Sequence, residues 1–303
     1  MNEPLKGNFE GVGIQFNIVK DTIMVVDAIP GGPSERLGIR AGDRILSIDG
    51  ENAAGAGFKN NDVMKRLRGK KGTKVTVMIN RRSEPAPLEF AITRDKIPIY
   101  SVEASYMATP HVGYIKVSRF SATTMKEFRE KLDELKAMGM DDLILDLQGN
   151  GGGYLRTAIE MSDEFLGDRK LIVYTQGRTS PREETFSTKE GRFEKGKLVV
   201  LVDEGSASAS EIVSGAMQDW DRGMIVGRRS FGKGLVQRPV MLPDGSAVRL
   251  TVSRYYTPSG RCIQKPYEDG VEAYRQEKGQ RLANGELTAV SYTHLTLPTN
   301  REV

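Results

Sequence analysis

The sequence predicts two domains of different fold class, a small β-rich domain followed by a larger α/β domain. Up to about residue 95, short runs of alternating apolar and polar residues are separated by turn pairs such as Asp49-Gly50, as is typical of small β-domains. Beyond that point apolar strands alternate with amphipathic helices, which favours a largely parallel sheet with crossover helices. The change of pattern predicts a domain boundary near Asp95-Lys96.

Apolar periodicity predicts the elements of each domain. The first domain should contain six short strands and two small helices. In the second domain we expect helices at 123–138, 154–166 and 208–220, and strands at 112–117, 143–147, 171–175, 198–202, 224–226, 235–241 and 248–255.

Both ends of the chain differ from the domains between them. Residues 1–9 resemble neither a secretory signal nor a natural domain start, so we expect an N-terminal remnant there. Residues 291–303 resemble translated adapter sequence at the end of an assembled gene fragment. We therefore expect a non-native tail in this range.

Composition excludes several classes of protein. The formal net charge is +4, and the two signs alternate along the chain, so no nucleic-acid-binding surface is expected. Cys262 is the one cysteine, which excludes an intramolecular disulfide and a thiolate zinc site. No run approaches the roughly 18 apolar residues of a membrane span.

Histidine is scarce, and this limits the possible hydrolytic chemistry. The chain has two, His111 before a predicted strand and His294 in the expected tail. A Ser-His-Asp triad, a Cys-His pair and a histidine-based metal site are therefore poorly supported. A hydrolase without histidine needs another base, and lysine can serve if burial lowers its pKa from about 10.4 toward neutrality.

A candidate nucleophile lies between the predicted strand at 198–202 and the helix that follows it. The intervening Gly-Ser-Ala-Ser-Ala-Ser-Glu places Ser208 at a strand–turn–helix junction. Free N–H groups at the start of that helix could stabilise the anion of an acyl-transfer intermediate. Ser208 and Glu211 also fit a capping box that only begins the helix, and the two roles are compatible.

A candidate base, Lys233, lies between two glycines that would let it enter a crowded site. Phe231 and Leu235 could help desolvate its amine. In a strand, residues 233, 235 and 237 share one face, so Gln237 would lie beside Lys233 and orient it. The alternative is an ordinary loop lysine between two strands. A phosphate-binding loop is excluded, because the Gly-x4-Gly-Lys-Ser/Thr order is absent.

A third motif contains four glycines within the five residues 149–153, directly after a predicted buried strand. Backbone amides in such a loop can complete an oxyanion hole. A dinucleotide-binding loop is the competing interpretation. It fails because no Gly-x-Gly-x-x-Gly register fits these residues.

Taken together, the motifs resemble the carboxyl-terminal processing peptidases, the tail-specific peptidase family S41. Members of that family have a PDZ domain, then Asp-Leu-Arg-Gly-Asn-Gly-Gly-Gly, Gly-Ser-Ala-Ser-Ala-Ser-Glu and Phe-Gly-Lys-Gly-x-Val-Gln. The corresponding segments here are 146–153, 205–211 and 231–237, within a match over roughly residues 11–266. Gln148 stands where arginine is usual, which puts a supporting ion pair in doubt.

The resemblance implies a fold and three catalytic residues. The fold would be α/β, with a PDZ domain at 10–95 and a ClpP/crotonase-like peptidase core at 96–290. Ser208 would be the nucleophile, Lys233 its general base 25 positions later, and Gln237 an assisting residue.

The resemblance also implies two binding features. An oxyanion hole would be formed by the N–H of Ala209 with that of Gly152 or Gly153. A PDZ groove would combine an edge strand at 15–17 with a carboxylate-binding loop and two helix positions, namely Gly11, Val12, Gly13, Ile14, Val63 and Leu67.

The expected function is that of a serine endopeptidase that cleaves near protein C-termini delivered by its PDZ domain. No cofactor or metal is expected. Family analogy implies an extracytoplasmic bacterial location, and a homodimer formed through regions missing here. Two alternatives remain: a catalytically silent peptide- or ligand-binding homologue of the same fold, and an enzyme gated by its PDZ domain.

Overall fold

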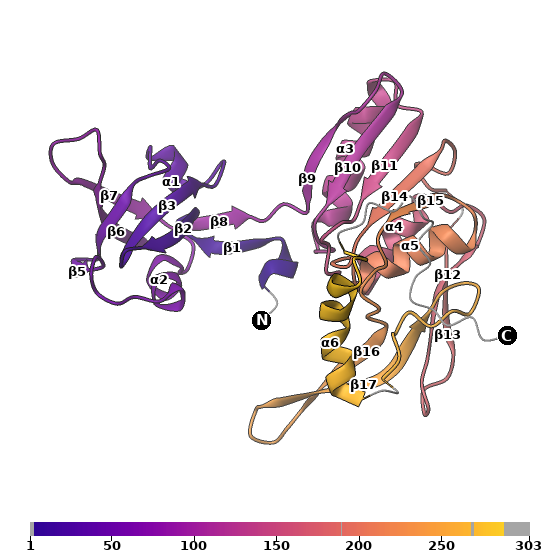
Figure 1. Ribbon diagram of the computed structural model, residues 1–303. Helices are drawn as coiled ribbons and strands as arrows, with labels where there is room; N and C mark the ends of the chain where they lie inside the picture. Colours follow the sequence, from indigo (N-terminus) through magenta and orange to yellow (C-terminus); the bar gives the residue numbers. More distant parts are fainter. Residues whose placement is uncertain (1–2, 189, 268–269, 288–303) are drawn as a thin grey trace. The chain divides into compact units, whose positions relative to one another are not determined.

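The computed structural model describes residues 3–188, 190–267 and 270–287, and the chain divides into two units, Met1–Ile99 and Tyr100–Val303 (Figure 1). The expected tail, with His294, lies outside the described residues. The division follows strand β8 (Asp95–Pro98). This strand pairs with β1 (Asn8–Gly11) to form a two-stranded ribbon. The boundaries predicted after residue 9 and after residue 95 both lie inside this ribbon.

The first unit is built from short antiparallel strands. Its larger sheet has the order β2-β3-β4-β6-β7, and β5 pairs with β4. Alternate residues of β6 are buried and form a core with Val63. The period-two pattern therefore buries one face of the sheet. The elements are η1 (Glu3–Lys6), β2 (Ile14–Val19), β3 (Thr22–Ala28), α1 (Pro33–Arg36), β4 (Arg44–Ile48), β5 (Glu51–Asn52), α2 (Asn60–Leu67), β6 (Lys74–Asn80) and β7 (Leu88–Thr93).

A five-stranded sheet of order β15-β14-β11-β10-β9 forms the centre of the second unit (Figure 1). All neighbouring strands are parallel except β9, which is antiparallel to β10. The largely parallel sheet predicted from the sequence is confirmed. Its strands are β9 (Val102–Met107), β10 (Val112–Val117), β11 (Asp142–Asp146), β14 (Leu198–Val202) and β15 (Met224–Gly227).

Three strands that the sequence pattern assigns to the parallel sheet lie instead in a second, antiparallel sheet. This sheet has the order β13-β12-β17-β16. The turn after Met241 is too short for a crossover helix, so the strands on either side of it must be antiparallel neighbours. The strands are β12 (Leu171–Gln176), β13 (Glu183–Phe186), β16 (Leu235–Met241) and β17 (Ala247–Tyr256).

Helix α5 (Ala209–Asp219) lies between the two sheets of the second unit, because it contacts both β12 and β15. It also packs against α4 (Leu155–Asp163), while α3 (Thr124–Ala137) covers β9 and β10. Every residue from Ala209 to Met217 is buried. The helix is therefore buried on all sides, and the residue before it is held by a well-packed element of the core.

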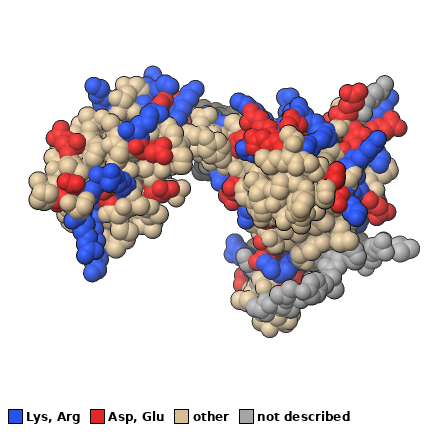
Figure 2. Space-filling view, turned by 90° about the horizontal axis from the view of Figure 1, so that it is seen from above, with Lys and Arg blue, Asp and Glu red and all other residues tan. Residues whose placement is uncertain are grey.

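The surface carries mixed charge. Figure 2 shows basic and acidic side chains interspersed over the face that it presents of each unit, in keeping with a net charge of only +4. Among the described residues, no helix combines the length and apolar character needed to cross a membrane.

Candidate active site

Two loops meet where the parallel strands β11 and β14 end. The glycine-rich loop (147–154) follows β11, and the serine loop (203–208) follows β14. They are joined by a hydrogen bond from Ala207 N–H to the Asn150 carbonyl oxygen at 2.9 Å. In open parallel sheets, ligands bind beyond the carboxyl ends of the strands. The joined loops therefore occupy the position where a site is expected.

Ser208 has a backbone conformation that few residues other than glycine adopt, with φ +56° and ψ −108°. It is half-buried, while its neighbours Ala207 and Ala209 are buried. Holding such a residue costs about 1–3 kcal/mol and persists only where the surroundings impose it. A sharp turn of this kind exposes a side chain at a strand–helix junction, as nucleophile elbows do. The sequence prediction placed Ser208 at this junction.

Gly152 lies directly against the serine. A Cβ atom at Gly152 would come within 2.9 Å of Ser208 Cβ and 2.7 Å of the Ala207 carbonyl oxygen, and its φ is +98°. Both the space and the backbone angle therefore require glycine.

The three predicted oxyanion donors differ in availability. Gly152 N–H already donates to Asn150 Oδ1 at 2.9 Å. The N–H groups of Ala209 and Gly153 donate to no described residue. Ala209 and Gly153 therefore remain candidate oxyanion donors. The N–H of Gly152 instead stabilises the glycine-rich loop through its hydrogen bond to Asn150.

Glu211 connects the predicted nucleophile to the predicted base. Its Oε2 accepts hydrogen bonds from Ser208 N–H at 2.7 Å and from Lys233 N–H at 2.9 Å. Its Oε1 accepts from Ser230 Oγ at 2.8 Å and from Gly232 N–H at 2.5 Å. Burial raises the pKa of this fully buried carboxyl, against the four hydrogen bonds, which lower it.

The sequence identified Glu211 only as a helix-capping residue. Its position three residues after Ser208 indicates a cap, and the bond to Ser208 N–H agrees with that. No local pattern relates it to residues more than twenty positions further along the chain. The contacts with the lysine segment depend on the way that segment packs against the start of α5.

The backbone around Lys233 is anchored on both sides. Gly232 C=O accepts from Lys265 N–H at 3.0 Å, and Gly234 N–H donates to Gln264 Oε1 at 3.0 Å. A Cβ atom at Gly234 would lie 2.3 Å from Gln264 N, so the second glycine is required by packing.

The side chain of Lys233 does not share this restraint. It is exposed, and no hydrogen bond between described atoms joins its Nζ to Ser208 Oγ. Lys233 N and Ser208 N share Glu211 Oε2, so the two backbone nitrogens cannot be farther apart than the sum of those two hydrogen-bond lengths. The structure thus brings the two backbones together without forming the bond between the side chains.

Gln237 is not placed beside Lys233. Its side chain is exposed, and its Nε2 lies 3.5 Å from Thr251 Oγ1 on β17. The hydrogen bonds of the described residues include none between Gln237 and Lys233. Lys233 precedes β16 and lies in a loop, so the strand alternation used to predict their shared face does not extend to it.

His111 lies far from the serine along the sheet. It precedes β10, at the amino end of a strand that is parallel to β11, whereas Ser208 follows the carboxyl end of β14. Its ring is exposed and its Nδ1 lies 3.2 Å from Asp141 Oδ2. Within the described residues, no group of three His, Cys, Asp or Glu side chains could hold a metal ion.

The first unit has a small cavity of about 110 Å³ between β2 and α2. Of the predicted groove residues, Val12, Gly13, Ile14 and Leu67 line it, and Phe9, Phe16, Met64 and Arg68 complete the lining. The N–H group of Gly13 donates to no described residue, whereas that of Val12 faces the Leu67 carbonyl oxygen in the backbone bridge between Gly11 and Arg68.

The two remaining groove residues lie elsewhere. Val63 is fully buried in the core, because it faces inward on α2 while Met64 faces the cavity. Gly11 ends β1 and bridges to Arg68 in the backbone.

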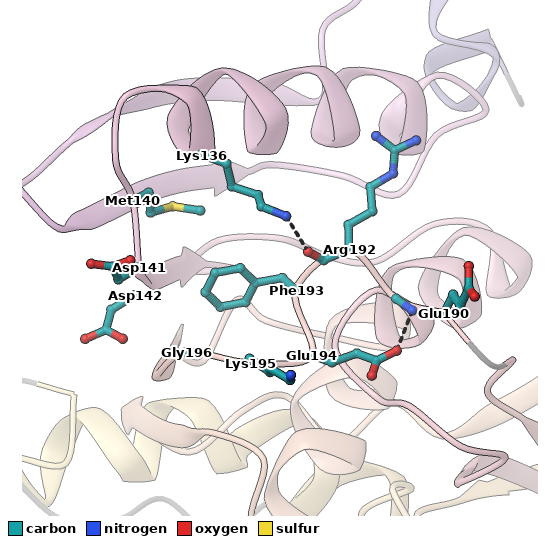
Figure 3. Close-up of a pocket in the computed structure, with 11 residues that line it drawn as sticks. Lys136, Met140, Asp141, Asp142, Glu190, Arg192, Phe193, Glu194, Lys195 and Gly196 are labelled. Atoms are coloured by element: carbon teal, nitrogen blue, oxygen red, sulfur yellow. Dashed lines mark hydrogen bonds between the residues drawn. The ribbon is translucent and has the colours of Figure 1, made fainter.

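A larger hollow of about 680 Å³ opens at the other end of the parallel strands, near the start of β11 (Figure 3). Its eleven lining residues include no Ser, Thr, Cys or His, and so no hydroxyl, thiol or imidazole nucleophile. Two of its charged residues are bound to the protein: Lys136 Nζ donates to the Arg192 carbonyl oxygen at 2.9 Å, and Glu194 Oε1 accepts from Gly191 N–H at 2.6 Å. The hollow is therefore a poorer candidate than the loops around Ser208.

Two sequence profiles match the chain. The profile described as "Peptidase family S41" covers residues 111–273, and the profile described as "PDZ domain" covers residues 24–81.

Individual relatives agree with these profiles. The chain is 36% identical over 264 residues to "Carboxy-terminal processing protease CtpA" of Bacillus subtilis, which covers 87% of this chain and 56% of that protein. It is 38% identical over 269 residues to the "Carboxy-terminal-processing protease" of Bartonella bacilliformis, with 87% and 61% covered. The chain thus spans less than two thirds of the length of these relatives.

A solved structure named "Photosystem II D1 C-terminal processing protease" is also similar. It superposes with a TM-score of 0.51 at 32% sequence identity, over 85% of this chain and 70% of that one.

Proposed function

The chain belongs to peptidase family S41, and on that premise we propose that it is a serine endopeptidase that cleaves near protein C-termini, with Ser208 as nucleophile and Lys233 as general base. The observation that carries the assignment is the shared carboxylate oxygen: Glu211 Oε2 holds the backbone N–H of both residues. The strained φ of Ser208 supports it, because such strain collects at active sites.

The proposed reaction needs no group from outside the chain except water. Lys233 takes the proton of Ser208 Oγ while that oxygen attacks the peptide carbonyl, and the proton then passes to the leaving amine. Water hydrolyses the resulting ester, which frees a carboxylate and restores Ser208. The N–H groups of Ala209 and Gly153 stabilise the oxyanion, since neither has another described acceptor.

For this step the exposed side chain of Lys233 must turn toward Ser208. Its backbone is already anchored, so rotation about side-chain bonds is enough. Catalytic hydrogen bonds are often formed only in the complex with substrate. We therefore interpret the open pair as the resting arrangement.

The substrate is proposed to be an exposed protein C-terminus, captured by the first unit. Its cavity is lined mainly by apolar side chains and suits one apolar terminal residue, and the N–H group of Gly13 is available to a carboxylate. We also propose, by the family analogy drawn from the sequence motifs, that the protein acts outside the cytoplasm.

Ser208→Ala and Lys233→Ala test the assignment, assayed on a peptide with an apolar C-terminus. Each should reduce kcat/KM at least about 10³-fold. Ser246→Ala in the β16–β17 turn and Lys126→Ala on α3 are matched controls, because both residues are exposed, and they should retain full activity. Normal turnover by either site variant would refute the Ser-Lys assignment. A serine-reactive probe that fails to label the wild-type protein would favour the catalytically silent homologue.

A further inference from the structure

We propose that the substrate segment near the cleaved bond binds as an additional β-strand on the free edge of β16, directly after Lys233. This inference rests on the proposed function and states how the substrate is held. Its occupant is an extended, unfolded stretch of polypeptide, because only an extended chain presents N–H and C=O groups in strand register.

The first observation is that β16 ends its sheet. The order β13-β12-β17-β16 gives it one neighbour, β17. No described strand pairs with its other side, and residues 237–241 are all exposed. An uncovered edge strand presents unpaired backbone groups that another chain can bind.

The direction of the backbone groups follows from hydrogen bonds at the two ends of the strand. The Gly234 carbonyl oxygen accepts from Tyr255 N–H at 2.8 Å, and Leu242 N–H donates to the Ser246 carbonyl oxygen at 2.8 Å. Groups at these even-numbered positions therefore face β17. Because successive residues of a strand alternate, the groups of the odd-numbered positions face the free edge.

A bulge in the ladder does not disturb this alternation. Val236 pairs with Ser253 and Gln237 with Thr251, so the extra residue lies in β17. Leu235 and Gln237 therefore each present an N–H and a C=O on the free edge.

Pro239 limits the length of this edge. It is the next odd-numbered residue, and it has no N–H to offer. Proline at an edge is one way in which proteins prevent long, unwanted strand pairing. On the Lys233 side of the proline the edge therefore has two donors, at Leu235 and Gln237, while Met241 lies beyond it.

The position of the edge links it to the chemistry. Leu235 follows Lys233 by two residues, or roughly 7 Å along an extended chain. Lys233 in turn shares a carboxylate oxygen with Ser208. A strand on this edge would pass beside the predicted base and bind through backbone groups that every peptide has. Binding would then select extended segments over folded ones, with little dependence on side chains.

A scan of substrate peptides tests the inference. In each peptide one backbone amide, other than the cleaved one, is replaced by an ester, which removes a single N–H and weakens one acceptor. Losing one hydrogen bond should lower kcat/KM roughly 2- to 12-fold. The largest losses should lie two residues apart, where the ester removes an N–H that faces the edge, and smaller losses should lie between them, where the ester only weakens a carbonyl that faces the edge. Uniform sensitivity along the peptide would overturn the inference.

Pro239→Ala provides a second, independent test. It adds an N–H on the free edge, which binds a substrate carbonyl oxygen, so the ester that weakens this carbonyl should lower kcat/KM more than it does in the wild type. Pro243→Ala, in the turn after β16, is the matched control and should leave the scan unchanged. An unchanged scan in Pro239→Ala would contradict the proposed edge.

The edge-binding inference and the catalytic assignment can fail independently. If Ser208→Ala still cleaves the all-amide peptide, the catalytic assignment fails. If Ser208→Ala is inactive but the ester scan has no two-residue period, only the edge-binding inference fails.

Discussion

The two sides of the candidate site are built differently, although both bind the same carboxylate. On the serine side, Ser208 begins helix α5, whose residues are buried through Met217. On the lysine side, Lys233 leads into β16, which is exposed from Gln237 onward. The nucleophile is therefore positioned by core packing, whereas the base lies in a loop that leads into an exposed hairpin and is positioned by backbone hydrogen bonds. This difference explains how the backbones of Ser208 and Lys233 can be close although no hydrogen bond joins their side chains.

Ser208→Gly should separate function from stability on the serine side. Activity should fall at least about 10³-fold with loss of the nucleophile. Stability should exceed that of Ser208→Ala by about 1–2 kcal/mol, because glycine relieves the strain at φ +56°. Urea unfolding of the two variants measures the difference. Equal stabilities would show that the serine backbone is not strained.

Gly152→Ala tests how closely the glycine-rich loop packs against Ser208. Its Cβ would press on Ser208 Cβ and the Ala207 carbonyl oxygen, so displacement of the serine should lower kcat about 10²-fold. Gly151→Ala is the matched control, since nothing lies within 4 Å of a Cβ there. Similar losses in both variants would argue against a specific contact.

Glu211→Gln tests the connection between the two sides. An amide keeps the size of the side chain but replaces one acceptor with a donor, so at least one buried N–H or O–H should lose its partner. We expect a loss of about 1–3 kcal/mol in unfolding free energy and a lower kcat. Retention of both by the variant would mean that the shared carboxylate does not position the site.

The same variant tests the raised pKa. A carboxyl with a raised folded-state pKa favours folding while protonated, and this contribution is lost as pH rises from its ordinary value of 4.5 through the raised value. The stability of the wild type relative to Glu211→Gln should therefore fall with rising pH across that window. Thermal unfolding over a pH series measures the trend, and a constant difference would contradict it.

The same substitution, valine to threonine, at one buried and one exposed position tests the difference in packing between α5 and the β16–β17 hairpin. The exposed position should give the smallest effect. Val213→Thr places a hydroxyl in the buried face of α5 and should cost about 1–3 kcal/mol. Val248→Thr on exposed β17 should stay within about 0.5 kcal/mol. Comparable costs would show that the hairpin is packed as tightly as α5.

Several features were predictable from local sequence because they depend on neighbours in the chain. Strand and helix periodicity located most elements of both units, and the turn-rich Gly-Ser-Ala segment placed Ser208 ahead of α5. The glycine that follows Lys233 is predicted to make room in a crowded site, and a Cβ at Gly234 would clash.

Other features depended on residues distant in sequence. The commitment of Gly152 N–H to Asn150 removes one predicted oxyanion donor, which no motif indicates. Val63 and Met64 are neighbours on α2, yet one joins the core and the other the cavity. Gln237 was expected beside Lys233, but the strand begins only after the lysine.

By itself, the sequence determined the family, the order of the two units and the two residues proposed to carry the reaction, because motif order and local periodicity are properties of the chain. Only the tertiary structure decided that Glu211 joins Ser208 to Lys233, and that the side chain of the lysine is exposed in the loop before β16. Those relationships arise from packing between segments more than twenty residues apart, and burial and hydrogen-bond partners exist only after the chain has folded.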